Sequence, residues 1–187
     1  RVYQEASYEK IKELFIRGRL TPVLEKKLRI ILGKIKKPLA VRSSGLFEDS
    51  LMQPFAGIFE TFLVPNSNED IEIRLRQLTD AIKLVYASIY SETARGYINA
   101  INYKIEEEKM AVILQEVVGE QYEEFYYPHI SGVSQSYNYY PFGHMQPEDG
   151  FAVIAVGLGT YVVEGKRLSG LHRSTRILKT IHQRTSI

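Results

Sequence analysis

The 187-residue sequence predicts a fold that mixes helices and strands, either α+β or α/β. Apolar residues recur at helical spacing over residues 6–36 and again over 71–89, with a less regular continuation to residue 101. Short β-rich runs stand at 110–118 and 151–156. With 44% hydrophobic and 25% charged residues, the composition is typical of a globular protein and argues against a disordered or fibrous chain.

The first helical segment is predicted to contain two helices. Its pattern is interrupted near Gly18 and starts again at Thr21 and Pro22, which are typical of an N-cap and a first helical residue. Pro38 ends the segment, because the residue before a proline avoids helical geometry.

The predicted strands are short. The run 39–41 is expected to be a buried strand that leads into a turn at 42–45, and a second strand is expected over 59–64. The run 161–163 is expected to lie near the strand at 151–156. Eight aromatic residues gather within 122–142, where we favour packing of a lobe or an interface over stacking on bases.

Charge is distributed unevenly along the chain. The formal charge is +7 over residues 1–37, −11 over 38–164 and +6 over 165–187. Basic ends around an acidic middle are compatible with a nucleic acid, with phosphate ligands, or with a fragment whose neighbours carried the balancing charge. We favour the fragment, which the start at Arg1 rather than Met also indicates. A nucleic-acid partner is the weakest of the three.

Several classes of protein are excluded by what the sequence lacks. It has no cysteine, which excludes disulfides, thiolate metal sites and cysteine nucleophiles, and its four histidines show no metal-ligand spacing. No signal peptide and no apolar run long enough for a bilayer are recognisable. We therefore expect a cytoplasmic protein without a membrane partner.

The segment Val41-Arg42-Ser43-Ser44-Gly45 is the first candidate site. A guanidinium grips a phosphate with two parallel hydrogen bonds, and hydroxyl and backbone N–H groups add further donors. On the residues alone, an ordinary turn in which Arg42 meets Glu48 or Asp49 is favoured over the phosphate site.

An ordered set of motifs resembles the nucleotide-binding domain of phosphoenolpyruvate synthase and pyruvate phosphate dikinase. It begins with Pro38-Leu-Ala-Val-Arg-Ser-Ser-Gly, the acidic pair Glu48-Asp49, and Phe55-Ala-Gly-Ile-Phe-Glu-Thr-Phe. Similar segments follow in the family's order, at 86–90, 110–118, 131–133 and 157–159. Each motif is short, but the order in which they occur is specific.

The resemblance implies an ATP-grasp-like α+β fold, with mixed or antiparallel sheets packed with helices and ATP and Mg²⁺ in a cleft between two lobes. Arg42 is then the catalytic residue, which holds the ATP phosphates. The other implied ligand-binding residues are Ser43 and Ser44 at the turn, Glu60 on the cleft side of its strand, Gln115, Glu116 and Val118 at the adenine, and Gly157 and Gly159 at the phosphates.

Two positions depart from the family pattern, since Tyr137 stands where an arginine is usual and Thr160 where a glutamate is usual. The family's amino-terminal portion, with its ATP-contacting lysine, is not recognisable. We therefore expect residues 1–187 to be one domain fragment of a larger protein, with a helical lead-in (1–37), a motif-bearing region (38–165) and a basic tail (166–187).

The function that the resemblance implies is transfer of a phosphoryl group from ATP to a histidine on a separate domain of the full-length protein, which also carries a pyruvate-binding domain. The isolated chain is then expected to be inactive. The two departures leave an alternative open, in which the chain is a degenerate, noncatalytic nucleotide-binding or scaffold domain.

Overall fold

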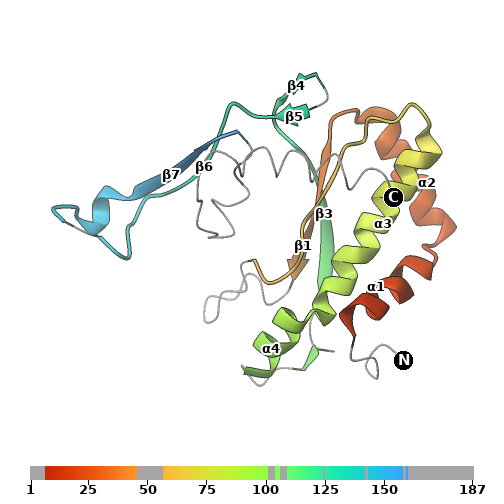
Figure 1. Cartoon of the computed structure of the whole chain (residues 1–187), viewed down its shortest axis with the longest axis horizontal. Helices are drawn as coiled ribbons and strands as arrows, with labels where there is room; N and C mark the ends of the chain where they lie inside the picture. The colour runs from red at the N-terminus through yellow and green to blue at the C-terminus, as the bar shows by residue number, and fades with distance from the viewer. Residues whose placement is uncertain are drawn as a thin grey trace. The chain divides into compact units, whose positions relative to one another are not determined.

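The computed structural model describes residues 7–45, 57–100, 104–105, 109–123, 125–141, 143–157 and 159 (Figure 1). The chain divides into two compact units, residues 1–117 and 118–187. Glu48, Asp49, Thr160, the expected strand at 161–163 and the basic tail lie outside the described residues. No described helix is long and apolar enough to cross a membrane.

The two predicted amino-terminal helices are confirmed. They are α1 (Tyr8–Arg17) and α2 (Pro22–Lys34). The Thr21 hydroxyl accepts a hydrogen bond from the Leu24 amide at 3.3 Å, which caps α2 as the sequence indicates.

The long helix predicted over 71–89 is confirmed as α3 (Ile71–Ala87), which the Asp70 carboxylate caps. A 3₁₀ helix (Ser88–Tyr90) then separates it from α4 (Glu92–Ala100). The less regular pattern beyond residue 89 therefore corresponds to a separate helix.

A three-stranded antiparallel sheet forms the other half of the first unit. Its central strand β1 (Leu39–Gly45) lies between β2 (Phe62–Val64) and β3 (Met110–Glu116). The turn predicted at 42–45 is wrong: these residues continue β1, because each of them pairs with a residue of β3 as far as Gly45 opposite Met110. The predicted strand at 59–64 is shorter than expected.

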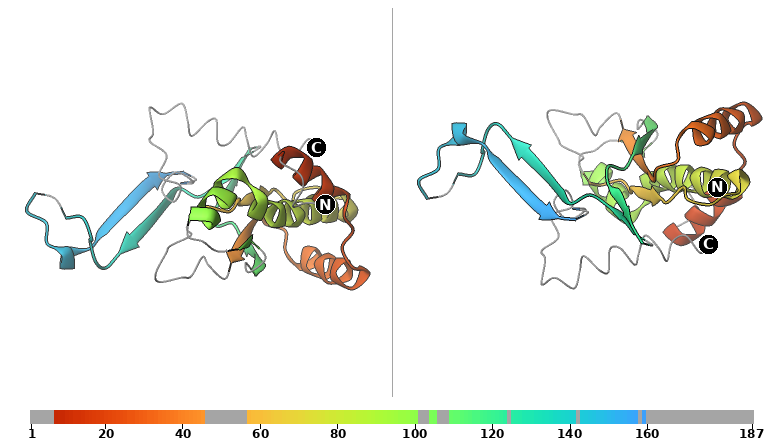
Figure 2. Two further views of the ribbon diagram at one scale, coloured as in Figure 1. Left: turned by 90° about the horizontal axis from the view of Figure 1, so that it is seen from below. Right: turned by 90° about the horizontal axis from the view of Figure 1, so that it is seen from above.

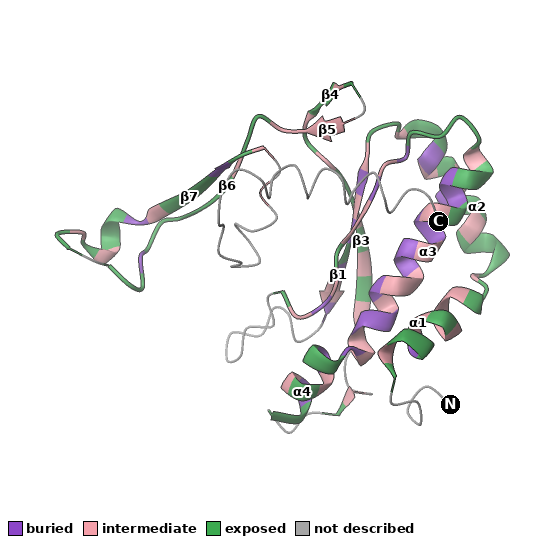
Figure 3. Ribbon diagram, viewed as in Figure 1, coloured by how far each residue is buried: buried purple, intermediate pink, exposed green. Residues whose placement is uncertain are grey.

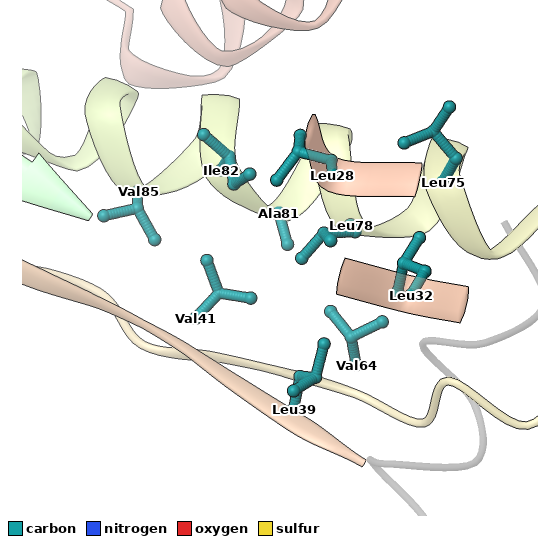
Figure 4. Close-up of a cluster of buried hydrophobic side chains, with 10 residues drawn as sticks. All are labelled: Leu28, Leu32, Leu39, Val41, Val64, Leu75, Leu78, Ala81, Ile82 and Val85. Carbon is teal, nitrogen blue, oxygen red and sulfur yellow. The ribbon is translucent and has the colours of Figure 1, made fainter. Parts of the chain in front are cut away.

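Helices α2 and α3 pack on one face of this sheet. Side chains alternate along β1, so that Leu39 and Val41 point into a hydrophobic core. Figure 3 shows buried stretches on both α3 and β1. Figure 4 shows this core between the helices and the sheet, and its members are Leu28, Leu32, Leu39, Val41, Val64, Leu75, Leu78, Ala81, Ile82 and Val85. One face of α3 and one face of β1 are therefore buried in this core.

A buried arginine joins α3 to the end of α2. Arg74 is 3% exposed and donates from Nη1 to the Leu32 carbonyl (3.0 Å) and to Asn66 Oδ1 (3.2 Å). Asn66 Nδ2 in turn donates to the carbonyls of Ile35 (2.9 Å) and Lys37 (3.0 Å). The guanidinium therefore meets the carbonyl end of α2, where the helix dipole favours a positive charge.

The second unit contains two antiparallel strand pairs. The first is β4 (Glu120–Tyr122) with β5 (Phe125–Tyr127), and the second is β6 (Ile130–Gln135) with β7 (Phe151–Val156). Figure 2 shows β6 and β7 as a two-stranded ribbon. The described residues thus form an α+β structure with antiparallel sheets and four α-helices, which confirms the α+β class.

We predict that Leu78→Ala lowers the free energy of unfolding by about 2–5 kcal/mol, because it leaves a cavity in a fully buried position. Ile73→Ala in the same helix, at a side chain that is 38% exposed, is the matched control and costs about 1 kcal/mol or less. Urea unfolding followed by circular dichroism measures both. Equal losses would show that this face of α3 does not form the core.

We also predict that Asn66→Ala costs about 2–4 kcal/mol, because it leaves Arg74 and two carbonyls without their buried partner. Asn66 has φ +55°, so Asn66→Gly avoids the backbone cost and is more stable than Asn66→Ala by about 1 kcal/mol. Asn68→Ala, at an exposed asparagine in the same loop, is the control for urea unfolding. A loss no larger than that of Asn68→Ala contradicts the role assigned to Asn66.

Candidate functional site

The second face of the β2–β1–β3 sheet is open in the described structure. Since Leu39 and Val41 point into the core, Ala40, Arg42 and Ser44 point to the opposite face. The strand register places Leu63, Ala111, Ile113 and Gln115 on that same face. We call this surface the open face; its members are half-buried or exposed, and Ile113 is 46% exposed.

Arg42 is the charged group of the open face. It lies opposite Ile113, is exposed, and donates from Nη1 to Gln115 Oε1 at 3.3 Å. Among the described residues, no carboxylate lies within ion-pair distance of its guanidinium. The structure thus brings two predicted site residues together, and their contact holds a cation on an uncovered surface.

The two predicted serines lie on different faces of β1. Ser44 is half-buried on the open face, two residues beyond Arg42. Ser43 is only 8% exposed and lies on the core face with Val41. A strand, unlike the expected turn, cannot direct both hydroxyls to the same ligand.

The end of β3 offers backbone groups beside the open face. The Val117 amide donates to the Pro38 carbonyl at 2.9 Å, so residues 117, 115 and 113 direct their backbone groups toward β1. Residues 116 and 114 direct theirs away from β1, and β3 is an edge strand among the described residues. Glu116 therefore presents a backbone N–H and a carbonyl at an edge with which no strand of the described residues pairs.

Glu60 lies elsewhere in the first unit. It lines a pocket with Ser7, Tyr8, Glu9, Ser91, Glu92 and Thr93, at the starts of α1 and α4. The pKa of Tyr8 is raised well above its usual range. The larger cause is burial, and the second is the negative charge of the Glu60 carboxylate. The structure therefore groups Glu60 with the helix starts and does not bring it to Arg42.

The remaining predicted residues belong to the second unit. Val118 is 80% exposed, and Gly159 is half-buried. Gly157 follows β7 with φ +82°, a conformation that favours glycine. Its N–H donates to the His129 carbonyl at 2.9 Å, and its own carbonyl accepts from Ser131 Oγ at 2.7 Å.

Among the residues that the structure describes, no three His, Asp or Glu side chains gather in a way that could hold a metal ion. Mg²⁺ is usually bound through one or two carboxylates together with phosphates and waters, so the expected Mg²⁺ stays a prediction.

Comparison with known proteins places the chain in a family. The model of the family described as "Pyruvate phosphate dikinase, AMP/ATP-binding domain" matches residues 2–182. The chain belongs to this family. The resemblance drawn from the sequence motifs is thereby confirmed, and the chain is an AMP/ATP-binding domain of the dikinase type.

A curated relative agrees with this dikinase-type assignment. The phosphoenolpyruvate synthase of Aeropyrum pernix is 30% identical over 172 residues, which cover 88% of this chain. The match covers 18% of the relative, so the chain spans less than a fifth of that protein's length.

Three of the seven residues of the open face, Arg42, Ser44 and Gln115, are among the predicted site residues of this AMP/ATP-binding domain, but the motifs do not show how the face is built. Gln115 is predicted beside the adenine, and its contact with Arg42 is not foreseen. The sequence carries no local signal that the strand continues through the segment expected to be a turn, because residues 39–44 are three apolar residues followed by three polar ones and do not alternate. The hydrogen bond from Ser131 to Gly157 joins residues 26 apart, and no local pattern indicates it.

Proposed function

We propose that the open face binds ATP, and that in the full-length protein the bound ATP gives a phosphoryl group to a histidine on a separate domain. The observation that carries this proposal is the exposed Arg42, held by Gln115 on an uncovered sheet face in an AMP/ATP-binding domain. The family's pyruvate-binding domain would use the phosphoryl group elsewhere in that protein.

Arg42 serves the phosphate end of the nucleotide. A guanidinium carries five N–H donors in a planar fork, and only Nη1 is directed at Gln115. The remaining donors can bind a phosphate with two parallel hydrogen bonds, and the Ser44 hydroxyl on the same face adds another donor. Phosphoryl transfer depends mainly on this kind of positioning and charge neutralisation.

In this proposal the adenine of ATP binds at the edge of β3, beside Glu116. Glu116 is three residues along β3 from Ile113, the partner of Arg42, which corresponds to about 10 Å of strand. That separation matches the reach of a nucleotide from its base to its phosphates. The backbone N–H and carbonyl of Glu116, with the amide of Val118, are the groups that we assign to the edge of the base.

Gly157 and Gly159 belong to the second unit. The role that the family resemblance implies for them, a close approach of the backbone to phosphates, stays a prediction for that unit. We assign no ligand contact to Ser43, which faces the core, or to Glu60, which lines the Tyr8 pocket.

A noncatalytic nucleotide-binding domain is the second candidate. Tyr137 replaces an expected arginine; it is 43% exposed and packs edge-to-face on Tyr139, with ring centroids 5.0 Å apart. Thr160 replaces an expected glutamate. The two candidates differ in one measurement: labelled ATP gives a phosphohistidine in the full-length protein if the domain is catalytic, and gives none if it only binds nucleotide.

We predict that Arg42→Ala weakens ATP binding roughly 10- to 100-fold, because it removes charge-assisted hydrogen bonds to phosphate. Arg42→Lys, which keeps the charge but loses the fork, gives an intermediate affinity. Isothermal titration calorimetry of the full-length protein with ATP and Mg²⁺ measures both.

The matched control is Arg76→Ala, which removes an exposed arginine from α3, on the helix-covered side of the sheet. This variant should bind ATP as the wild type does. An Arg42→Ala variant with unchanged affinity, or an equal loss in Arg76→Ala, argues against ATP binding on the open face.

A further inference from the structure

Helix α2 carries aliphatic and basic side chains in turn along its outer side. Four exposed residues recur at the spacing that places side chains in one line on a helix: Val23, Lys27, Ile30 and Lys34. We call these four residues the α2 stripe. Its valine is 66% exposed and its isoleucine 53%. Leu28 and Leu32, on the other side of the helix, are buried in the core of the first unit.

The composition of the α2 stripe favours an acidic protein surface as its partner. No carboxylate among the described residues lies within ion-pair distance of Lys27 or Lys34. A helix that lies on a membrane separates its aliphatic and basic residues on two faces, and nucleic-acid phosphates give aliphatic side chains no apolar contact. The α2 stripe mixes both kinds of residue in one line, which an acidic surface with aliphatic side chains matches.

One face of the β6–β7 ribbon has the complementary aliphatic side chains. Ile130 pairs with Val156 and Gly132 with Ile154, and alternate residues of a strand share a face. These four residues, which we call the ribbon face, expose their isoleucines by 66% and 68% and their valine by 82%. A two-stranded ribbon is marginally stable by itself, so burial of this face by a partner stabilises it.

Acidic residues stand at both ends of the ribbon. The Tyr122 hydroxyl donates to Glu120 Oε2 at 3.4 Å and lies 2.6 Å from His129 Nε2, which places a carboxylate near the start of β6. At the other end, the 3₁₀ helix η4 (Pro147–Asp149) carries the exposed Glu148 just before β7. The ribbon face is thus an aliphatic surface between carboxylates.

We infer that the α2 stripe of one copy of this chain docks on the ribbon face of a second copy. The charges are complementary: residues 1–37 have a formal charge of +7, whereas residues 118–159 contain five acidic residues and no lysine or arginine. The lengths also match, since the 13 residues of α2 and the six residues of each ribbon strand both span about 20 Å. Helix α2 packs on the sheet face opposite the open face, so this inference is independent of the proposed ATP site.

Cross-linking between two variants of the full-length protein tests this contact. One variant carries Lys26→Cys beside the α2 stripe, and the other carries Ser134→Cys on the ribbon face, so that the two new thiols meet only between copies. Both substitutions keep every residue of the two surfaces. We expect a short bismaleimide to join the two cysteine peptides in the mixed sample, as identified by mass spectrometry. Gln135→Cys, exposed on the opposite face of the ribbon, is the matched control and should give little product.

Charge reversal shows whether the cross-link depends on the assigned residues. Lys27→Glu with Lys34→Glu should lower its yield at least about tenfold, because like charges then face each other. Glu120→Lys with Glu148→Lys in the other copy should restore the yield.

Three results overturn the inference: no cross-link in the mixed sample, an equal yield with Gln135→Cys, or a yield that charge reversal does not change. A link that forms only when both cysteines are in one chain overturns it as well. Binding of DNA or of phosphatidylserine vesicles that needs Lys27 and Lys34, with no link between copies, assigns the α2 stripe to an anionic ligand instead and likewise overturns it.

Discussion

The packing of α2 and α3 on one face of the β2–β1–β3 sheet is the interaction on which the first unit depends. It fixes which side chains of β1 are buried, because a strand sends alternate residues to opposite faces. Leu39 and Val41 point into the core, so the side chain of Arg42 lies on the opposite face. The buried Arg74, bonded to Asn66 and to the end of α2, joins the same helices through polar groups.

This constraint also explains how the domain can offer a cation to a phosphate. Because Arg42 is exposed, its guanidinium stays hydrated and costs little desolvation energy. The side-chain oxygen of Gln115 orients the guanidinium without neutralising its charge. A carboxylate in the same position would compete with an anionic ligand for the guanidinium. The edge of β3 adds uncharged backbone groups nearby, which suit the base of a nucleotide. The family to which the chain belongs binds AMP or ATP, and these features fit that ligand.

The sequence predicts the parts of the fold that local pattern controls. Helices α1, α2 and α3 follow from their apolar spacing, and the Thr21 cap from its place before Pro22. The end of β1 was misjudged because serine and glycine favour turns locally, whereas pairing with β3 is a long-range contact. Strands β4, β5 and β6 were not predicted. Strands β4 and β5 have only three residues each within the aromatic stretch, and β6 has two apolar residues, Ile130 and Val133, at a spacing that is not an alternation. The candidate site shows the same limit: motifs name Arg42 and Gln115, but only the strand register shows that they touch.

The central claim is that nucleotide binds on the open face, and the side chain opposite Arg42 reports on it directly. Ile113 lies on the open face and Ile82 lies in the core, so their methyl groups form a matched pair in one NMR spectrum. Addition of ATP and Mg²⁺ to the full-length protein should shift the Ile113 methyl signal and leave that of Ile82 in place. Saturating ATP that shifts neither signal, or shifts Ile82 alone, would contradict the account.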